Sequence, residues 1–274
     1  FSILGTSVWA GLESGKELED KLEWVKFSNL AWAADSSGFY YSRFPATKEG
    51  AEFQSLNKNQ TVYFHATGTS QDTDKLVYAR EDHPDWLLIP QISEDGRFLI
   101  IYSQVGSGGN QMAFLDLSKA NAEAVFITTN FKNEFAFVGN VEGKLIFRTN
   151  LDAPRGRLVA IDSENPDREN WQELVAESEA VMRGASLVGN SLIAAYLKDA
   201  YSQVHQFALD GTAIRKVELP GIGSVSGFGG KADGTDSFYS YSSFNSPPTV
   251  YRFATDSGES TVFKTAEVDF DPAD

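Results

Sequence analysis

The stretch "ISEDGRFLIIYS" (92–103) joins a polar turn to an apolar strand. Its Asp and Gly residues are typical of a tight turn, and the run that follows is rich in the aromatic and β-branched residues that favour strands. The pattern therefore predicts a β-hairpin. Whether that hairpin stands alone or is one copy of a repeat depends on the rest of the chain.

Four further stretches share this pattern of a Gly or Asn turn followed by an aromatic or aliphatic strand. They are "WAADSSGFYYSRF" (32–44), "GNVEGKLIFRTN" (139–150), "LVGNSLIAAYL" (187–197) and "KADGTDSFYSYSSF" (231–244). The successive spacings are 58, 47, 47 and 44 residues, counted from Gly38 through Gly96, Gly143 and Asn190 to Gly234. Spacing this regular indicates a repeat.

A second kind of strand follows about 20 residues after each of these turns, and it alternates apolar and polar residues. The five copies are "TVYFHATGT" (61–69), "QMAFLDLSK" (111–119), "RLVAIDSEN" (157–165), "QVHQFALDG" (203–211) and "TVYRFATDSG" (249–258). A sixth copy, "SVWAGLESGK" (7–16), precedes the first complete repeat. Further strands such as "AVFITTN" (124–130) come after them, so each repeat holds four predicted strands.

Four strands in about 45 residues are typical of one antiparallel blade of a β-propeller. Helical repeats fit poorly, because only "GKELEDKLEWVK" (15–26) hints at a helical period. We therefore predict an all-β chain forming a single β-propeller domain over residues 1–274. Its predicted parts are a partial blade (1–26), five blades at about 27–83, 84–133, 134–178, 179–222 and 223–266, and a linker stub (267–274).

The composition excludes several classes of function. A formal net charge of -15 without a visible Lys/Arg cluster argues against nucleic-acid binding. No apolar run approaches the roughly 20 residues of a membrane helix, and the N-terminus lacks the basic segment of a signal peptide. The absence of cysteine excludes disulfides and thiol chemistry but leaves the compartment open. We expect a soluble protein of the cytoplasm, with a periplasmic location as the alternative.

Several segments, in order from about residue 15 to the C-terminus, resemble the propeller of prolyl oligopeptidases. They are "LEWVKFSNLAW" (22–32), "YFHATGTSQDTDKLVY" (63–78), "SEDGRFL" (93–99), "NLDAPRGRLVAID" (150–162), "YLKDAYSQVHQFALDG" (196–211), "LPGIGSVSG" (219–227) and "SSFNSPPTVYRF" (242–253). The resemblance implies a seven-bladed propeller that is inserted into an α/β-hydrolase domain and admits only short peptides to a Ser, Asp, His site. The chain holds material for only five to six blades. From the resemblance, we expect its partner to be the α/β-hydrolase domain of the parent peptidase.

The chain itself lacks the sequence signals of catalysis. The nucleophile elbow G-x-S-x-G does not occur, and "GSVSG" (223–227) has its serines at the wrong places. Of the three histidines, His65 and His205 lie inside predicted strands and are expected to be packed or surface side chains rather than general bases; His83 is the third. Acidic turns such as "DSENPDREN" (162–170) lack the pattern of a calcium loop. We expect no enzyme activity, no metal and no cofactor in this chain alone.

The resemblance also implies four substrate-binding positions. The family's propeller adds apolar side chains to the pocket for the residue two before the proline at the scissile bond. Phe27 retains the phenylalanine of the V-K-F-S stretch, and Leu87 stands where relatives commonly have methionine. The next stretch departs from the family, because Gln104 replaces an arginine and Ser107 replaces a small residue. For both Phe27 and Leu87, burial in the core of a blade is the alternative interpretation, and for Leu87 it is the simpler one.

Two hypotheses of different classes follow. In the first, the chain is the non-catalytic lid and size filter of a prolyl oligopeptidase-like serine peptidase acting on short proline-containing peptides. In the second, it is a free-standing propeller, natural or engineered, that serves as a binding scaffold. A hydrolase-facing surface should expose a sizeable apolar or polar, hydrogen-bonding patch, whereas a free scaffold should present a wetter, more charged face.

Overall fold

The computed structural model describes residues 7–10, 17–46, 56–106, 108–244 and 246–266. The chain divides into two compact units, Phe1–Asn133 and Glu134–Asp274. Apart from the short 3-10 helices η1 (Gln71–Thr73) and η2 (Arg168–Asn170), the regular elements of the described segments are strands. No helix in these segments is long and apolar enough to cross a membrane.

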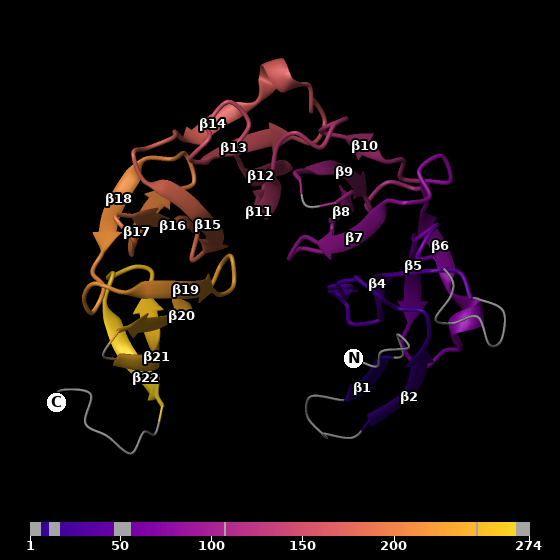
Figure 1. The fold of residues 1–274 in the computed structure, drawn as a ribbon, viewed down its shortest axis with the longest axis horizontal. Coiled ribbons are helices and arrows are strands. Elements are labelled where there is room, and N and C mark those ends of the chain that lie inside the picture. Colours follow the sequence, from indigo (N-terminus) through magenta and orange to yellow (C-terminus); the bar gives the residue numbers. More distant parts are fainter. Residues whose placement is uncertain (1–6, 11–16, 47–55, 107, 245, 267–274) are drawn as a thin grey trace. The chain divides into compact units, whose positions relative to one another are not determined.

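The first unit contains a strand pair and two four-stranded sheets, each an antiparallel meander (Figure 1). The pair consists of β1 (Ser7–Ala10) and β2 (Glu17–Leu22). The first sheet holds β3 (Ala31–Trp32), β4 (Gly38–Arg43), β5 (Thr61–Ala66) and β6 (Lys75–Tyr78). The second sheet holds β7 (Leu87–Ile92), β8 (Phe98–Gln104), β9 (Asn110–Asp116) and β10 (Val125–Phe126).

The second unit contains three sheets of the same four-stranded order (Figure 1). One holds β11 (Phe135–Val141), β12 (Lys144–Thr149), β13 (Arg157–Asp162) and β14 (Gln172–Val175). The next holds β15 (Val181–Val188), β16 (Ser191–Lys198), β17 (Tyr201–Ala208) and β18 (Ala213–Val217). The last holds β19 (Ser224–Gly229), β20 (Asp236–Ser243), β21 (Ser246–Ala254) and β22 (Ser260–Thr265).

The predicted repeat of four antiparallel strands is confirmed, and the hairpin at 92–103 is its clearest case. Strands β7 and β8 pair through Ile92 and Leu99, on either side of a turn in which Gly96 has a φ of 73°. A Cβ at Gly96 would lie 2.8 Å from the Cβ of Ala34 in the neighbouring sheet. The turn therefore needs glycine both for its backbone conformation and for the close approach of that sheet.

The hint of a helical period at 15–26 is wrong, because residues 17–22 form β2. Asp20 and Leu22 are buried while Lys21 between them is exposed, which is the alternation of a strand with one covered face. Leu22 packs with Phe39 and Tyr41 of β4. Burial against that sheet outweighs the local helical preference of this charged segment.

Apolar side chains fill the space between neighbouring sheets of each unit. In the first unit, Val62 of β5 packs in one cluster with Leu88, Leu99 and Ile101 of the next sheet. In the second unit, one cluster joins the sheet of β11–β14 to that of β15–β18, and another joins the latter to the sheet of β19–β22. Burial of apolar surface in such layers is the main favourable term in folding.

A buried polar cluster ties β2 to the first sheet. His65 on β5 is 1% exposed, and its two ring nitrogens lie 2.9 Å from Asp20 Oδ1 and 2.7 Å from Asp74 Oδ1. Tyr41 donates its hydroxyl to the other oxygen of Asp74 at 2.5 Å, and the Gly68 amide donates to Asp20 at 2.6 Å. Burial raises the pKa of Asp20, but the bonds from His65 and Gly68 outweigh it and lower that pKa overall. His65 is thus a packed side chain.

We expect His65→Ala to lower the free energy of unfolding by about 3 to 5 kcal/mol, because it leaves two buried carboxylates without their shared partner. Urea unfolding followed by tryptophan fluorescence measures the change. His83→Ala is the matched control, since the His83 side chain is 41% exposed. Equal stabilities of the two variants would contradict a structural role for the cluster.

Asp116, the last residue of β9, gives a test of pH dependence. It accepts hydrogen bonds from the Arg97 guanidinium, one of them 2.8 Å long, and from Ser118, and these interactions hold the pKa of its carboxyl well below the usual range. The stability from a carboxyl with a lowered pKa is complete above the pKa of the unfolded chain and is lost as the pH falls.

We expect Asp116→Asn to be less stable than the unsubstituted chain at pH 7, with a difference that shrinks below about pH 4, near the pKa of a free aspartate. Thermal unfolding from pH 7 to pH 2 measures it. Asp233→Asn changes the same charge at an exposed position and serves as the control. A difference that is constant with pH would show that the ionised form of Asp116 is not what stabilises the turn.

Candidate functional site

Phe27 lies in the connection between β2 and β3, and its side chain is 61% exposed. Its backbone has a φ of 53°, a left-handed conformation that is uncommon for a large side chain. The structure therefore excludes the alternative that Phe27 is blade core. The flat apolar ring of Phe27 is thus exposed to solvent. Its left-handed backbone conformation is unfavourable by itself and has to be stabilised by the surrounding residues.

Leu87 and Gln104 lie opposite each other at one end of the sheet of β7–β10. Leu87 is the first residue of β7, Gln104 is the last of β8, and the two are paired across the strands. Both side chains are partly exposed. The structure thus brings these two predicted residues together, while Ser107 lies outside the described residues.

Buried Gln60 connects the Phe27 segment to the start of β7. Its side-chain amide donates to the carbonyl of Lys26 at 2.8 Å and lies 3.4 Å from that of Phe27. Its Oε1 accepts the backbone N–H of Leu88 at 2.7 Å. The residue is 2% exposed and its bond to Leu88 is buried, so water does not compete for the Leu88 N–H.

Ser42 on β4 completes this connection. Its hydroxyl donates to the carbonyl of Leu88, and its backbone N–H donates to the hydroxyl oxygen of Ser28 at 2.7 Å. The side chains of Gln60 and Ser42 therefore bind both backbone groups of Leu88, and the same two residues bind Lys26 and Ser28 on either side of Phe27. Phe27 and the neighbour of Leu87 are held in one network of hydrogen bonds.

Sequence reasoning missed Gln60, Ser42 and Ser28. The signal for Gln60 was its period-two relation to Val62, which places both residues on the buried face of the strand that begins at Thr61. A buried glutamine needs partners for its amide, but the sequence does not show that those partners come from residues 26 and 88.

Of the fourteen large apolar side chains exposed in the described segments, seven lie at one edge of the sheets, where strands begin or end; the others lie elsewhere, mostly on the last strand of each sheet. In a four-stranded meander, the first and third strands begin, and the second and fourth strands end, on the same side of the sheet. We call this row of strand ends the edge, as distinct from an edge strand. In the first unit, Phe27, Leu56 and Val105 lie in or next to connections at this edge. In the second unit, this edge exposes Val181, Leu197, Ile222 and Phe244.

The remaining catalytic signals do not assemble into a hydrolytic site. Both serines of "GSVSG" lie in strand β19, whereas a nucleophile elbow requires a turn between a strand and a helix. His83 stacks on Trp86 with ring centroids 3.8 Å apart. Within the described segments, no group of three or more His, Cys, Asp or Glu residues could hold a metal ion.

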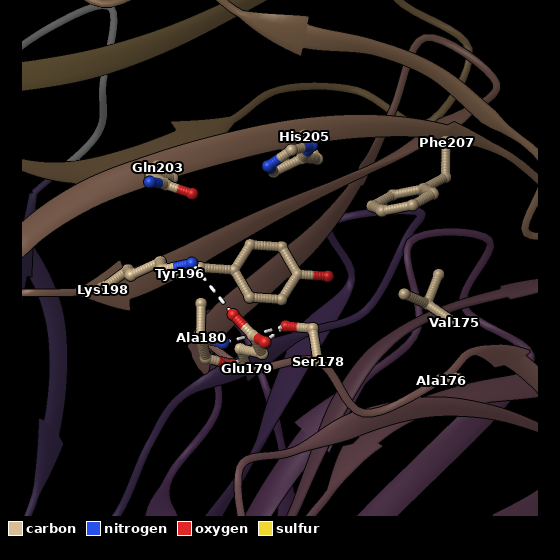
Figure 2. A pocket seen from close by; sticks show the side chains of 10 residues that line it. All are labelled: Val175, Ala176, Ser178, Glu179, Ala180, Tyr196, Lys198, Gln203, His205 and Phe207. Carbon is tan, nitrogen blue, oxygen red and sulfur yellow. Dashed lines mark hydrogen bonds and ion pairs between the residues drawn. The ribbon is translucent and has the colours of Figure 1, made fainter.

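His205 lines a cavity of about 410 Å³ between the β14–β15 connection and strands β16 and β17 (Figure 2). Burial, together with nearby Lys216, lowers the pKa of His205, and burial raises the pKa of Tyr196 to about 12. Ser178 donates its hydroxyl to the backbone carbonyl of Ala180, so that hydroxyl is not poised for proton transfer to His205. The cavity is lined chiefly by apolar and neutral groups.

We expect Gln60→Leu to cost about 1 to 3 kcal/mol of stability, because it leaves the buried Leu88 N–H unsatisfied and removes the bond to the partly buried Lys26 carbonyl. Amide hydrogen exchange should accelerate at Leu88. Gln60→Glu keeps the acceptor for Leu88 but lacks the donor to Lys26, so its Leu88 amide should stay more protected than in Gln60→Leu.

Gln172→Leu provides the matched control for Gln60→Leu, since Gln172 is exposed on β14. Unchanged protection of the Leu88 amide in Gln60→Leu would show that Gln60 does not hold the start of β7.

Comparison with known proteins gives one consistent answer. The family described as the N-terminal β-propeller domain of prolyl oligopeptidase matches residues 9–266. The prolyl endopeptidase of Elizabethkingia miricola is 34% identical over 260 residues, which cover 95% of this chain and 36% of that relative. The prolyl endopeptidase of Elizabethkingia meningoseptica is 32% identical with the same coverage. The chain thus spans about a third of the length of these curated relatives.

Solved structures show the same likeness. A prolyl endopeptidase from a study of inter-domain dynamics in catalysis and specificity superposes with a TM-score of 0.88 at 29% identity, over 96% of this chain and 39% of that one. Prolyl oligopeptidase B from Galerina marginata, bound to a 35mer substrate, gives a TM-score of 0.85 at 23% identity, over 97% of this chain and 38% of that one. The second likeness concerns the fold alone. Together with the five four-stranded sheets, these neighbours confirm the predicted propeller fold.

Proposed function

Because the chain belongs to the N-terminal β-propeller family of prolyl oligopeptidases, we propose that it is the lid and size filter of a serine peptidase for short proline-containing peptides. In this proposal the catalytic groups belong to an α/β-hydrolase domain that the propeller covers. The propeller acts sterically, because a narrow passage or a gap opened by domain motion admits oligopeptides and excludes folded proteins.

The observation that carries the proposal is the row of apolar side chains exposed at one edge of the sheets. Ile222 is 79% exposed and Phe244 fully exposed in the second unit, as Phe27 is 61% exposed in the first. Exposed apolar side chains that lie at the same edge within one unit usually mark a surface that meets a partner. This supports a covered edge, and it disfavours the alternative of a free scaffold, which would present a more charged face.

The proposed contribution to substrate binding comes from Phe27, Leu87, Gln104 and Ser107. Phe27 and Leu87 would form an apolar wall for the substrate residue two positions before the proline, and Gln104 would offer an uncharged polar group beside it. The exposure of Phe27, its left-handed backbone and the Gln60 network support this assignment. A backbone segment that is already held in place loses less conformational entropy when a ligand binds to it.

The proposal is tested by mixing the chain with a separately expressed prolyl oligopeptidase hydrolase domain. We expect the chain to bind that domain and to suppress cleavage of a long proline-containing polypeptide while sparing a short proline reporter. In the mixture, Phe27→Ser should raise the KM for a reporter with an apolar residue two positions before the proline by about tenfold, through loss of the apolar wall.

Phe263→Ser is the matched control for Phe27→Ser, because Phe263 is 63% exposed but lies on β22, the last strand of its sheet. Equal suppression of the long and short substrates would argue against a size filter. Equal effects of the two serine variants would argue against a role of Phe27 in substrate binding.

A further inference from the structure

A cavity of about 330 Å³ lies in the second unit, at the edge where its sheets expose apolar side chains. The end of β12, the β12–β13 connection and the start of β15 form its walls. Three arginines, Arg148, Arg155 and Arg183, line it together with Glu134 and Asn150. This concentration of guanidinium groups occurs in a chain with a formal net charge of -15.

The backbone that carries Arg155 is fixed on both sides. Its N–H donates to a carboxylate oxygen of Glu177 at 2.5 Å, and its carbonyl accepts the N–H of Met182 at 2.7 Å. The next residue, Gly156, has a φ of 89°, and a Cβ there would lie 3.1 Å from the Cβ of Met182. The connection is thus held tightly against the start of β15, and the cavity exists without a ligand having to shape it.

Arg155 and Arg183 are the arginines that lack a partner within the described segments. Six others pair with carboxylates, including Arg148, whose guanidinium lies 3.5 Å from Glu134. Arg215 donates to the backbone carbonyl of Asp256, and Arg43 lies over the ring of Tyr63. These two arginines line the same cavity, although acidic residues exceed basic ones in this chain.

The net positive charge around the cavity favours a negatively charged ligand. Three guanidinium groups beside the carboxylates of Glu134 and Glu177 leave one net positive charge, which a single negative charge neutralises. The planar fork of arginine matches a carboxylate in two parallel hydrogen bonds. The cavity is larger than one carboxylate, so it also has room for the residue that carries the group.

We propose that the cavity around Arg155 and Arg183 binds the C-terminal carboxylate of a short peptide. The carboxylate follows from the charge and shape of the cavity, whereas the choice of a peptide as its source rests on the proposed function. Such a site would orient a peptide by its free end, independently of the residue recognised at Phe27. It would favour peptides with an uncapped C-terminus.

The test is a titration of the whole chain, labelled with ¹⁵N, with acetyl-Ala-Pro-Ala as the free acid and as the C-terminal amide, followed by amide chemical shifts. We expect the acid to shift the signals of Arg155, Gly156 and Arg183, and the amide to bind at least about tenfold more weakly, as the loss of a charge-assisted pair implies. The double variant Arg155→Gln, Arg183→Gln should lose the preference for the acid. Its other signals should stay in place, because both side chains are exposed.

Arg252→Gln removes the same charge from the exposed face of β21 and should leave the affinity unchanged. The proposal is overturned if acid and amide bind equally, if the double variant keeps its preference, or if inorganic phosphate binds more tightly than the acid. Acetate binding as tightly as the peptide would overturn the peptide as the source of the carboxylate.

The two proposals fail separately. The titration uses this chain without a hydrolase domain, so a missing response to the peptide acid leaves the size-filter assay untouched. Conversely, a mixture that shows no size selectivity while the acid still binds at Arg155 refutes the proposed function alone.

Discussion

The packing of each four-stranded sheet against the next is the interaction on which the other features of each unit depend. Leu88 and Leu99 meet Val62 across the first unit, and Met182 meets Leu158 across part of the second. Because side chains alternate along a strand, a slip of one residue in register would turn such a layer to solvent. The strands are therefore fixed by their core, and the connections at the sheet edges remain available for other contacts.

Buried polar groups then hold in position segments that the packing of the apolar layers alone would not fix. His65 binds β2 to its sheet through Asp20, and Gln60 binds the Phe27 segment to the backbone of Leu88. Each of these bonds replaces water that burial has removed, so breaking one leaves an unsatisfied group. Because all of these hydrogen bonds must form, the segments that they join have one defined geometry. The strained backbone of Phe27 requires such a geometry.

Most of the arginine side chains have partners within their own sheet. In a chain with many more acidic than basic residues, most arginines are paired with carboxylates, and those pairs link strands or turns within a sheet. Within the described segments, the side chains of Arg155 and Arg183 have neither a carboxylate nor another partner; Arg155 lies on a connection whose backbone is held by Glu177 and Met182, and Arg183 lies on β15. They line a cavity at the same edge of the second unit as its exposed apolar side chains.

The sequence by itself determined the repeat, the four strands of each copy, the turn at Gly96 and the family resemblance that singled out Phe27 and Leu87. The strands and turns of each repeat can be identified locally, because alternation and turn residues act within a few positions of one another. The tertiary structure decided that Phe27 faces solvent and that the segment at 15–26 includes a strand. It also decided that Gln60 lies between the Phe27 segment and β7. The physical reason is that the burial of a side chain and the partner of a polar group depend on residues far away in the sequence, which only the packed sheets bring together.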